Sequence, residues 1–363
     1  MIDADRMQLL HQVDRTLCRL SYVRYNYFWL TPLNIDEEFD KFESSGGSYV
    51  PQFRYPSFSV RKEIGELESL DIPVDTPLGR LFDRIRNDFL VEARALDAIG
   101  TDWFDTTSLF SPPDDYVVSV AYDILSRFPS SQAVSDNPKR ITPRKLGESL
   151  LSRIRSYGLS GWTVEYGNYL SSVSVSSGTR TVRIKKGVMF SKKQLDKLLI
   201  HEVGTHILRM ENGHRQRFRI FAHGLPGYLP TEEGLAGYNE RRNGLGSAQI
   251  ERAYALRALA THLSVSQGFV QVYDGIRPFV DDDYTAFLIV TRAKRGLGDT
   301  SRPGGYLKDH CYLQGKLLIE EFLARGGDVT RLYVGKIGVD DLWLVDEGVV
   351  HPPRYLPSFL VDR

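Results

Sequence analysis

The sequence predicts an α+β protein that is mainly helical, with a small antiparallel or mixed β-sheet among its helices. Two observations lead to this fold class. Apolar residues recur at helical spacing in several long stretches, as in amphipathic helices. Apolar and polar residues alternate in three short stretches, 162–166, 173–175 and 182–184, as in half-buried strands. We expect this sheet to come immediately before the helix that carries His201.

The expected helices follow from apolar spacing and from residues that begin a helix. Starts are indicated by Pro77 after Thr76, by Thr142, by Ser191 and by Thr231, whose hydroxyl could cap the helix that it opens. We expect helices over residues 4–24, 77–98, 112–125, 142–154, 191–208, from 231 onward, 248–263 and 308–324. The last part of the chain, from residue 328, carries no pattern that assigns it.

A polar stretch bounded by prolines, residues 129–140, indicates a boundary within the chain. We expect residues 1–135 to form a mostly helical region that packs on the core. Residues 136–363 then form the domain that holds the candidate site. The 363 residues are enough for roughly two or three domains.

The composition is that of an ordinary soluble protein, with 42% hydrophobic and 25% charged residues. The 46 basic and 46 acidic residues balance, so no overall charge attracts nucleic acid or an anionic membrane. Only two cysteines, Cys18 and Cys311, are present, which argues against a disulfide scaffold or a thiolate zinc site and favours a reducing compartment. The sequence shows neither the apolar segment of a signal peptide nor the roughly 18 apolar residues of a membrane span. We therefore expect a cytoplasmic protein with no nucleic-acid or membrane partner.

The segment from His201 to His206 contains residue types that bind and use zinc. Two imidazoles and a carboxylate can hold the ion, and a catalytic zinc keeps one position for water. The ion lowers the pKa of that water and polarises a carbonyl group. Glu202, next to the first imidazole, is placed to take the proton of the water and pass it to the leaving amine.

The spacing of the two histidines is unusual. The common zinc helix carries its imidazoles four residues apart, which separates them by about 40° around the helix axis. Here they are five residues apart, which gives about 140° at roughly 100° per residue. A regular α-helix would not direct both rings at one ion. We therefore predict a π-bulge or a distorted turn between Val203 and His206, with Gly204 as the residue that permits it.

A second segment, residues 231–236, offers the third ligand. Glu232 and Glu233 are adjacent, so they point in different directions on a helix. The stretch from Glu233 to Glu240 is similar to the Glu-Gly-Phe-Ala-x-Tyr-x-Glu helix of zinc aminopeptidases, in which the first glutamate is the ligand. That resemblance selects Glu233. Glu232 could hold a ligand in place or cap the helix, and Gly234 would let the helix pack close to its partner.

Several motifs together resemble the microtubule-associated tyrosine carboxypeptidase (MATCAP) family. This family, formerly a domain of unknown function, includes bacterial proteins described by a "QEGLP motif". The motifs are His-Glu-Val-Gly-Thr-His-Ile-Leu-Arg-x-x-Asn-Gly-x-x-Gln at 201–216, Gly-Leu-x-Gly-Tyr at 224–228 and Thr-Glu-Glu-Gly-Leu-Ala at 231–236. Similarity continues at 292–296 and 308–315.

The resemblance implies a zinc metallocarboxypeptidase of the gluzincin type that acts on the C-terminus of a peptide or protein. Carried over by position, His201, His206 and Glu233 bind Zn²⁺ and Glu202 is the general base. The animal members remove the C-terminal tyrosine of α-tubulin. This sequence shows no long basic extension that could dock on acidic microtubules, so tubulin itself is not carried over.

A carboxypeptidase must also hold the terminal carboxylate of its substrate, a task that suits arginine and lysine. The basic candidates in the matching motifs are Arg292, Arg295 and Lys308. Tyr312 or His310 could steady the oxyanion, and Asn212, in the first motif, is a further candidate for substrate binding.

Two other functions remain open from the sequence. The first is a zinc endopeptidase on a similar core, with an open-ended groove and no cation closing it near the metal. The second is a regulatory or binding protein in which zinc is structural. Structural sites usually have four protein ligands, mostly cysteine, whereas this set offers three with a free acid beside them.

Overall fold

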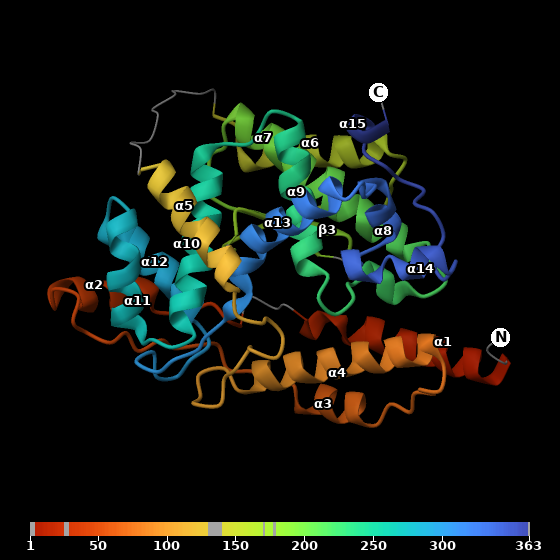
Figure 1. Ribbon diagram of the computed structural model, residues 1–363, viewed down its shortest axis with the longest axis horizontal. Helices are drawn as coiled ribbons and strands as arrows, with labels where there is room; N and C mark the ends of the chain where they lie inside the picture. The colour runs from red at the N-terminus through yellow and green to blue at the C-terminus, as the bar shows by residue number, and fades with distance from the viewer. Residues whose placement is uncertain (1–3, 25–28, 130–139, 170, 177–178, 362–363) are drawn as a thin grey trace.

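The computed structural model describes residues 4–24, 29–129, 140–169, 171–176 and 179–361, and Figure 1 shows how their elements are arranged. The described chain is mainly helical and contains one three-stranded sheet, as the sequence predicts. No described helix combines the length and the apolar character needed to cross a membrane.

The N-terminal helices form a layer along one edge of the molecule (Figure 1). This layer consists of α1 (Ala4–Leu20), α3 (Arg61–Glu68) and α4 (Pro77–Asp97). The start of α4 is as predicted, because Pro77 lies in its first turn and the Thr76 hydroxyl accepts a hydrogen bond from the Gly79 N–H at 3.0 Å. Helix α3 was not predicted from the sequence.

A second group of helices surrounds its own apolar cluster, in which the rings of Phe42, Phe269 and Phe287 meet. Its members are α2 (Ile35–Ser44), α5 (Asp115–Arg127), α10 (Ala248–Ser264), α11 (Phe269–Ile276) and α12 (Asp283–Lys294). The predicted helices at 112–125 and 248–263 correspond to α5 and α10. Helices α2, α11 and α12 were not predicted.

The sheet lies where the alternating pattern predicts it. After α6 (Pro143–Ser156), strands β1 (Thr163–Gly167), β2 (Val173–Ser176) and β3 (Thr181–Lys185) form a sheet in the order β1-β3-β2. The β1–β3 pair is parallel and the β2–β3 pair is antiparallel, so the sheet is mixed.

One long helical segment follows the sheet. It consists of α7 (Lys192–Leu198), a π-helix over Leu199–Ile207 (η2) and α8 (Leu208–His214). Ser191 begins it with a capping box: its hydroxyl accepts from the Gln194 N–H, and the Gln194 side chain accepts from the Ser191 N–H. The predicted helix at 191–208 is therefore confirmed, and it continues to His214.

The next helix, α9 (Leu229–Arg242), begins two residues earlier than predicted, with Pro230 in its first turn. The predicted cap at Thr231 is wrong. Because Thr231 already lies inside the helix, its hydroxyl instead accepts a hydrogen bond from the Val339 N–H at 3.0 Å. This bond ties α9 to the C-terminal part of the chain, which includes α14 (Trp343–Asp346) and α15 (Ser358–Val361).

The N-terminal layer shares one apolar cluster with the elements around the π-helix. Leu17 of α1 and Phe82 of α4 belong to the same cluster as Ile207 and Leu235. Buried Arg24 adds a polar connection, since it pairs with Glu92 of α4 at 3.0 Å and donates to the Gly224 carbonyl at 2.5 Å. The predicted boundary at 129–140 lies almost wholly outside the described residues.

Helix α9 crosses α13 (Cys311–Ala324) at very close range, as expected from Gly234. A methyl group at Gly234 would lie 2.0 Å from the Gly315 carbonyl oxygen, and one at Gly315 would lie 2.0 Å from that of Pro230. Both obstacles are backbone atoms, which cannot rotate away as a side chain can. The two glycines therefore set the distance between the helices, and with it the position of Glu233.

Gly315→Ala is expected to destabilise the protein by about 1–3 kcal/mol, because the added methyl group would force the two helices apart. Chemical denaturation measures this change. Gly65→Ala is the matched control: Gly65 lies inside α3 with nothing within 4 Å of its added methyl group, so that variant should be neutral or slightly more stable. Equal effects of the two substitutions would contradict the role given to this crossing.

Candidate metal centre

The widened turn predicted from the histidine spacing is present as the π-helix Leu199–Ile207. A π-helix repeats its hydrogen bonds from residue i to i+5, so residues five apart come onto one face. His201 and His206 are five apart, and their ring centroids lie 4.6 Å from each other. The prediction of a distorted helix between Val203 and His206 is confirmed.

Gly204 has a different role from the one predicted. It is not among the residues with positive φ, so the wide turn does not depend on a conformation that only glycine adopts readily. A methyl group at Gly204 would instead lie 3.2 Å from the ring of Phe359 in α15. The missing side chain makes room for this C-terminal helix.

Buried hydrogen bonds hold the π-helix against α9. The Tyr333 hydroxyl donates to the Gly204 carbonyl at 2.8 Å, and the Asn239 amide donates to the hydroxyls of both Tyr333 and Thr205 at 2.8 Å. The Thr205 hydroxyl in turn donates to the Ile200 carbonyl at 3.3 Å. Each bond satisfies a group that is costly to leave unpaired away from water.

Three side chains converge on one point and form the only group of potential metal ligands found among the described residues. Donor atoms of His201, His206 and Glu233 all lie within 4.8 Å of one another. Glu233 Oε2 is 3.8 Å from His201 Nε2 and 4.0 Å from His206 Nε2. Bonds of about 2.0–2.1 Å around a tetrahedral zinc place ligand atoms about 3.3 Å apart, so the two distances from Glu233 are about 0.5 and 0.7 Å longer than in a zinc site.

Glu233 Oε2 is the atom whose surroundings fit a cation most clearly. This oxygen is buried and has no hydrogen-bond partner. A buried, unpaired carboxylate oxygen is costly, and a metal ion would remove that cost by binding it.

Each histidine is held by a carboxylate on its other nitrogen. His201 Nδ1 lies 2.6 Å from Glu240, and His206 Nδ1 lies 2.8 Å from Glu232. When Nδ1–H donates to a carboxylate, the lone pair of Nε2 is free for a metal, and the ring cannot turn away. The fit to a metal such as zinc thus includes the supporting residues as well as the ligands.

The role of Glu240 was not predicted, although the sequence contains a signal for it. Glu240 lies seven residues after Glu233, which is two helical turns and therefore the same face of α9. For Glu232, the sequence left open a helix cap or an acid that holds a ligand. The contact with His206 supports the second.

Two cationic side chains and the imidazole of His206 keep Glu232 ionised. Burial alone would raise the pKa of Glu232, but Lys336 at 3.2 Å, the ion pair with Arg209 and the contact with His206 hold it well below its usual range. Arg209 is itself fully buried and donates to the carbonyls of Leu332 at 2.8 Å and Ile337 at 2.6 Å.

Charges at the centre also shift the pKa values of His201 and Glu202. Burial works against a charged imidazole, but the hydrogen bond with Glu240 and the neighbouring carboxylates raise the pKa of His201 to about 9. The cluster thus attracts positive charge, either protons or a metal. Burial raises the pKa of Glu202, which brings that carboxyl closer to the range where it can accept and release a proton.

Of the substrate-binding candidates, Lys308 and Tyr312 lie beside the cluster. Lys308 is in the short helix η5 (Leu307–His310), and its Nζ lies 3.8 Å from Glu233 Oε1 and 5.7 Å from the centre of the Tyr312 ring. Arg292 and Arg295 both pair with Asp309, next to Lys308, at 2.6 and 3.7 Å.

The other two candidates bond to groups outside the cluster. The Asn212 amide donates to the Tyr355 carbonyl and accepts from the N–H groups of Arg354 and Tyr355, all within 2.9 Å. Its role is thus to hold the C-terminal segment against α8. Buried His310 uses Nδ1 on the Leu307 carbonyl at 2.7 Å. These contacts give no support to the predicted roles of Asn212 in substrate binding and of His310 in steadying the oxyanion.

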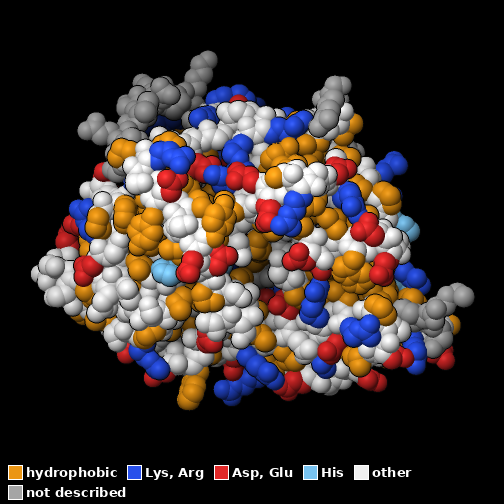
Figure 2. All heavy atoms as spheres, in the orientation of Figure 1, with side chains coloured by type: hydrophobic (Ala, Val, Ile, Leu, Met, Phe, Trp, Pro, Cys, Tyr) orange, Lys and Arg blue, Asp and Glu red, His pale blue; other side chains and the backbone are white. Residues whose placement is uncertain are grey.

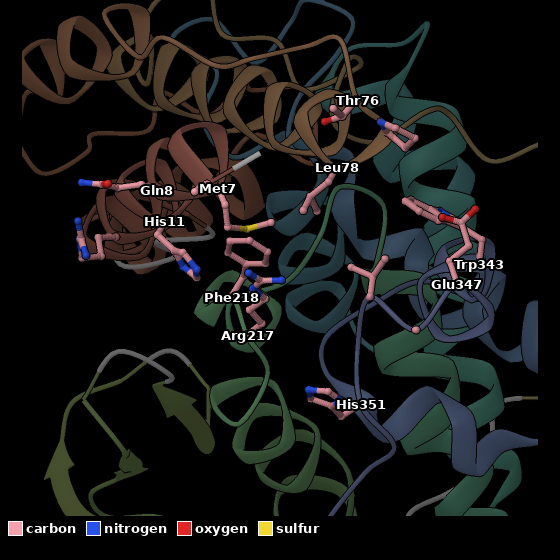
Figure 3. Close-up of a pocket in the computed structure, with 15 residues that line it drawn as sticks. Met7, Gln8, His11, Thr76, Leu78, Arg217, Phe218, Trp343, Glu347 and His351 are labelled. Carbon is pink, nitrogen blue, oxygen red and sulfur yellow. The ribbon is translucent and has the colours of Figure 1, made fainter. Parts of the chain in front are cut away.

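A large groove of about 1370 Å³ lies away from these residues. It is formed by α1, the start of α4, the loop at Phe218 and the chain around Trp343, as Figure 3 shows. None of the cluster residues lines it. Figure 2 shows acidic and basic side chains intermixed on one face of the molecule, with a hollow near its middle and no broad area of one charge. This groove is therefore separate from the cluster of potential metal ligands.

The comparison with known families identifies the chain. Residues 40–363 match the family model described as microtubule-associated tyrosine carboxypeptidase. The chain belongs to this family.

Individual relatives with low sequence identity carry the same family name. The microtubule-associated tyrosine carboxypeptidase 1 proteins of Mus musculus and Rattus norvegicus are each 33% identical over 176 residues, which is 46% of this chain and 36% of theirs. The Homo sapiens protein is 25% identical over 344 residues, which is 92% of this chain and 64% of its own. The matched region thus spans less than two thirds of the length of each of these relatives.

Tyr333→Phe is expected to cost about 1–3 kcal/mol of stability, because it removes two buried hydrogen bonds, the one donated to the Gly204 carbonyl and the one accepted from the Asn239 amide. Tyr122→Phe is the control, since that tyrosine is 46% exposed on α5. Urea denaturation of both variants compares the two hydroxyls. A Tyr333→Phe protein as stable as the control would show that these hydrogen bonds contribute nothing to holding the π-helix.

Proposed function

We propose that this protein is a zinc-dependent carboxypeptidase of the gluzincin type. It would remove one residue, with tyrosine as the first candidate, from the C-terminus of a peptide or protein. The observation that carries the proposal is the convergence of two Nε2 atoms on the buried, unpaired oxygen of Glu233. The family to which the chain belongs and the names of its relatives support a carboxypeptidase.

The donor set favours a catalytic zinc over a structural one. Two imidazoles and one carboxylate leave a position for water, whereas structural sites are usually closed by four protein ligands. The buried acid Glu202 is next to His201 and could act as a general base. A structural zinc site needs no such group. Bound here, the ion would supply positive charge that acidifies a water molecule and polarises the scissile carbonyl.

Each residue of the site has a role in the proposed reaction. Glu202 takes a proton from the attacking water and delivers it to the nitrogen of the leaving residue. Glu240 and Glu232 keep the two imidazoles in the orientation and tautomer that present Nε2.

Positive charge on one side of the site suits a substrate that ends in a carboxylate. Lys308 lies against Glu233, and the pKa of Lys308 is well above its usual range: burial would lower it, but Tyr312, Cys311 and Glu233 favour the charged form. The ammonium group therefore stays charged. The proposed substrate is a peptide or protein C-terminus in general; tubulin is not part of the proposal.

The amidated form of a peptide tests the proposal directly. Zinc-loaded protein is expected to release tyrosine from a peptide that ends in a free carboxylate, and to leave the amidated peptide intact. Glu202→Gln should abolish this release, because the glutamine cannot accept the proton, while the zinc content stays that of the wild type. Chromatography of the products and metal analysis measure the two results.

The alternative functions give other results in the same experiment. Equal cleavage of both peptides would identify an endopeptidase. No cleavage of either, with zinc bound, would favour a structural metal. Loss of zinc from the Glu202→Gln protein would mean that Glu202 is a ligand and does not act as the general base.

Glu240→Gln is expected to weaken zinc binding by about 10–100-fold, because a neutral amide holds the His201 ring less firmly than a carboxylate does. Titration against a competing chelator measures the affinity. Glu320→Gln, a half-exposed residue of α13, is the control for loss of one negative charge. Unchanged affinity in the Glu240 variant would remove that residue from the site.

A further inference from the structure

Arg257 is a cationic residue near the site that was not among the candidates from the sequence. It lies on α10 and is partly buried, and its guanidinium carbon is 4.9 Å from the centre of the Tyr312 ring. Within the described part of the chain, this guanidinium makes the ring contact but no hydrogen bond or ion pair. The ring contact therefore restrains the guanidinium, and its N–H groups donate to no carboxylate of the described chain.

Asp309, a carboxylate that feels the charge of this arginine, already has other partners. Arg292 and Arg295 pair with Asp309, and both of them, together with Arg257, lower the pKa of Asp309 although burial would raise it. Two of these guanidinium groups contact Asp309, whereas Arg257 acts on it through its charge alone. Asp309 is thus already paired with two other arginines, which leaves the Arg257 guanidinium available for an anionic group of a ligand.

Tyr312 connects Arg257 to the metal centre. Its ring is approached by Arg257 at 4.9 Å and by Lys308 at 5.7 Å, and Lys308 also lies 3.8 Å from Glu233. Tyr254 stacks on the same ring, with 5.4 Å between the ring centres and 24° between the ring planes. The aromatic pair restrains the position of Arg257 relative to the proposed ligand Glu233.

A peptide that places its last peptide bond at the cluster, with its terminal residue directed toward Tyr312, would direct its terminal carboxylate toward Arg257. One residue spans at most about 3.5 Å, so the carboxylate lies only that far beyond the reacting carbonyl carbon. A guanidinium group can bind a carboxylate through two parallel hydrogen bonds, which an ammonium group cannot do.

We propose that Arg257 binds the terminal carboxylate of the substrate and thereby sets the preference for peptides with a free C-terminus. This assignment rests on the proposed carboxypeptidase function. It makes Arg257 a specificity-determining residue and leaves Lys308 beside the metal ligand. Arg292 and Arg295 then act through Asp309, by neutralising it.

Binding measurements on protein that cannot turn over its substrate test the assignment. The full chain with Glu202→Gln is titrated with a short peptide ending in tyrosine, as the free acid and as the amide, with and without zinc. The free acid is expected to bind roughly tenfold or more tightly than the amide. Adding Arg257→Met should reduce this preference to less than about twofold, chiefly by weakening the binding of the acid.

Two further variants separate charge from geometry. Arg257→Lys should retain part of the preference, because the charge remains but the paired hydrogen bonds do not. Arg302→Met, which removes a half-exposed arginine that pairs with Asp102, should behave like the parent protein. Thermal unfolding of each variant shows whether it is folded. If Arg257→Met does not fold, the comparison is made with Arg257→Lys.

The outcomes for the two proposals differ. An acid preference that survives in Arg257→Met, or equal weakening of acid and amide, would overturn the role of Arg257 and leave the carboxypeptidase proposal standing. A parent protein with no preference for the acid, together with cleavage of the amidated peptide by the wild type, would overturn the carboxypeptidase proposal itself.

Discussion

The candidate site depends on one constraint: two histidines five residues apart must face the same point. A regular α-helix separates them by about 140° around its axis, and the chain meets the constraint by widening nine residues into a π-helix. The π-helix is a rare conformation, and neighbouring elements stabilise it here. Asn239 and Tyr333 bond to it, and α15 packs against it at Gly204. Much of the fold around the site serves to hold this segment of helix.

A chain of buried charges then connects the metal centre to the rest of the protein. Glu232 contacts His206 on one side and Arg209 and Lys336 on the other. Arg209 donates to two backbone carbonyls of the C-terminal segment. Removing one partner of such a buried ion pair typically costs about 3–5 kcal/mol, because the remaining charge is left without compensation. The position of His206 is therefore coupled to segments that lie far later in the sequence.

Local signals in the sequence were enough to predict much of this structure. The capping residues Thr76, Thr142 and Ser191 begin helices where expected, because a cap needs only the next few residues. The alternating stretches became the sheet, and the histidine spacing led to the widened turn. The predictions that failed depend on distant contacts. Thr231 bonds to Val339 and does not cap its helix, and Gly204 is small because Phe359 lies against it.

By itself, the sequence determined which residues could form a metal site and what local shape their spacing requires, because both depend on residue type and on helix geometry. Only the tertiary structure decided how these residues are supported. The selection of Glu240 and Glu232 as partners of the histidines depends on how α9 lies against the π-helix, and the position of α9 is set by its contact with α13 at Gly234 and Gly315. The place of Arg257 beside Tyr312 likewise depends on how α10 packs, which no local pattern encodes. Side chains far apart in the chain meet only after the backbone has folded, and for that reason the π-helix at His201 could be predicted while its supports could not.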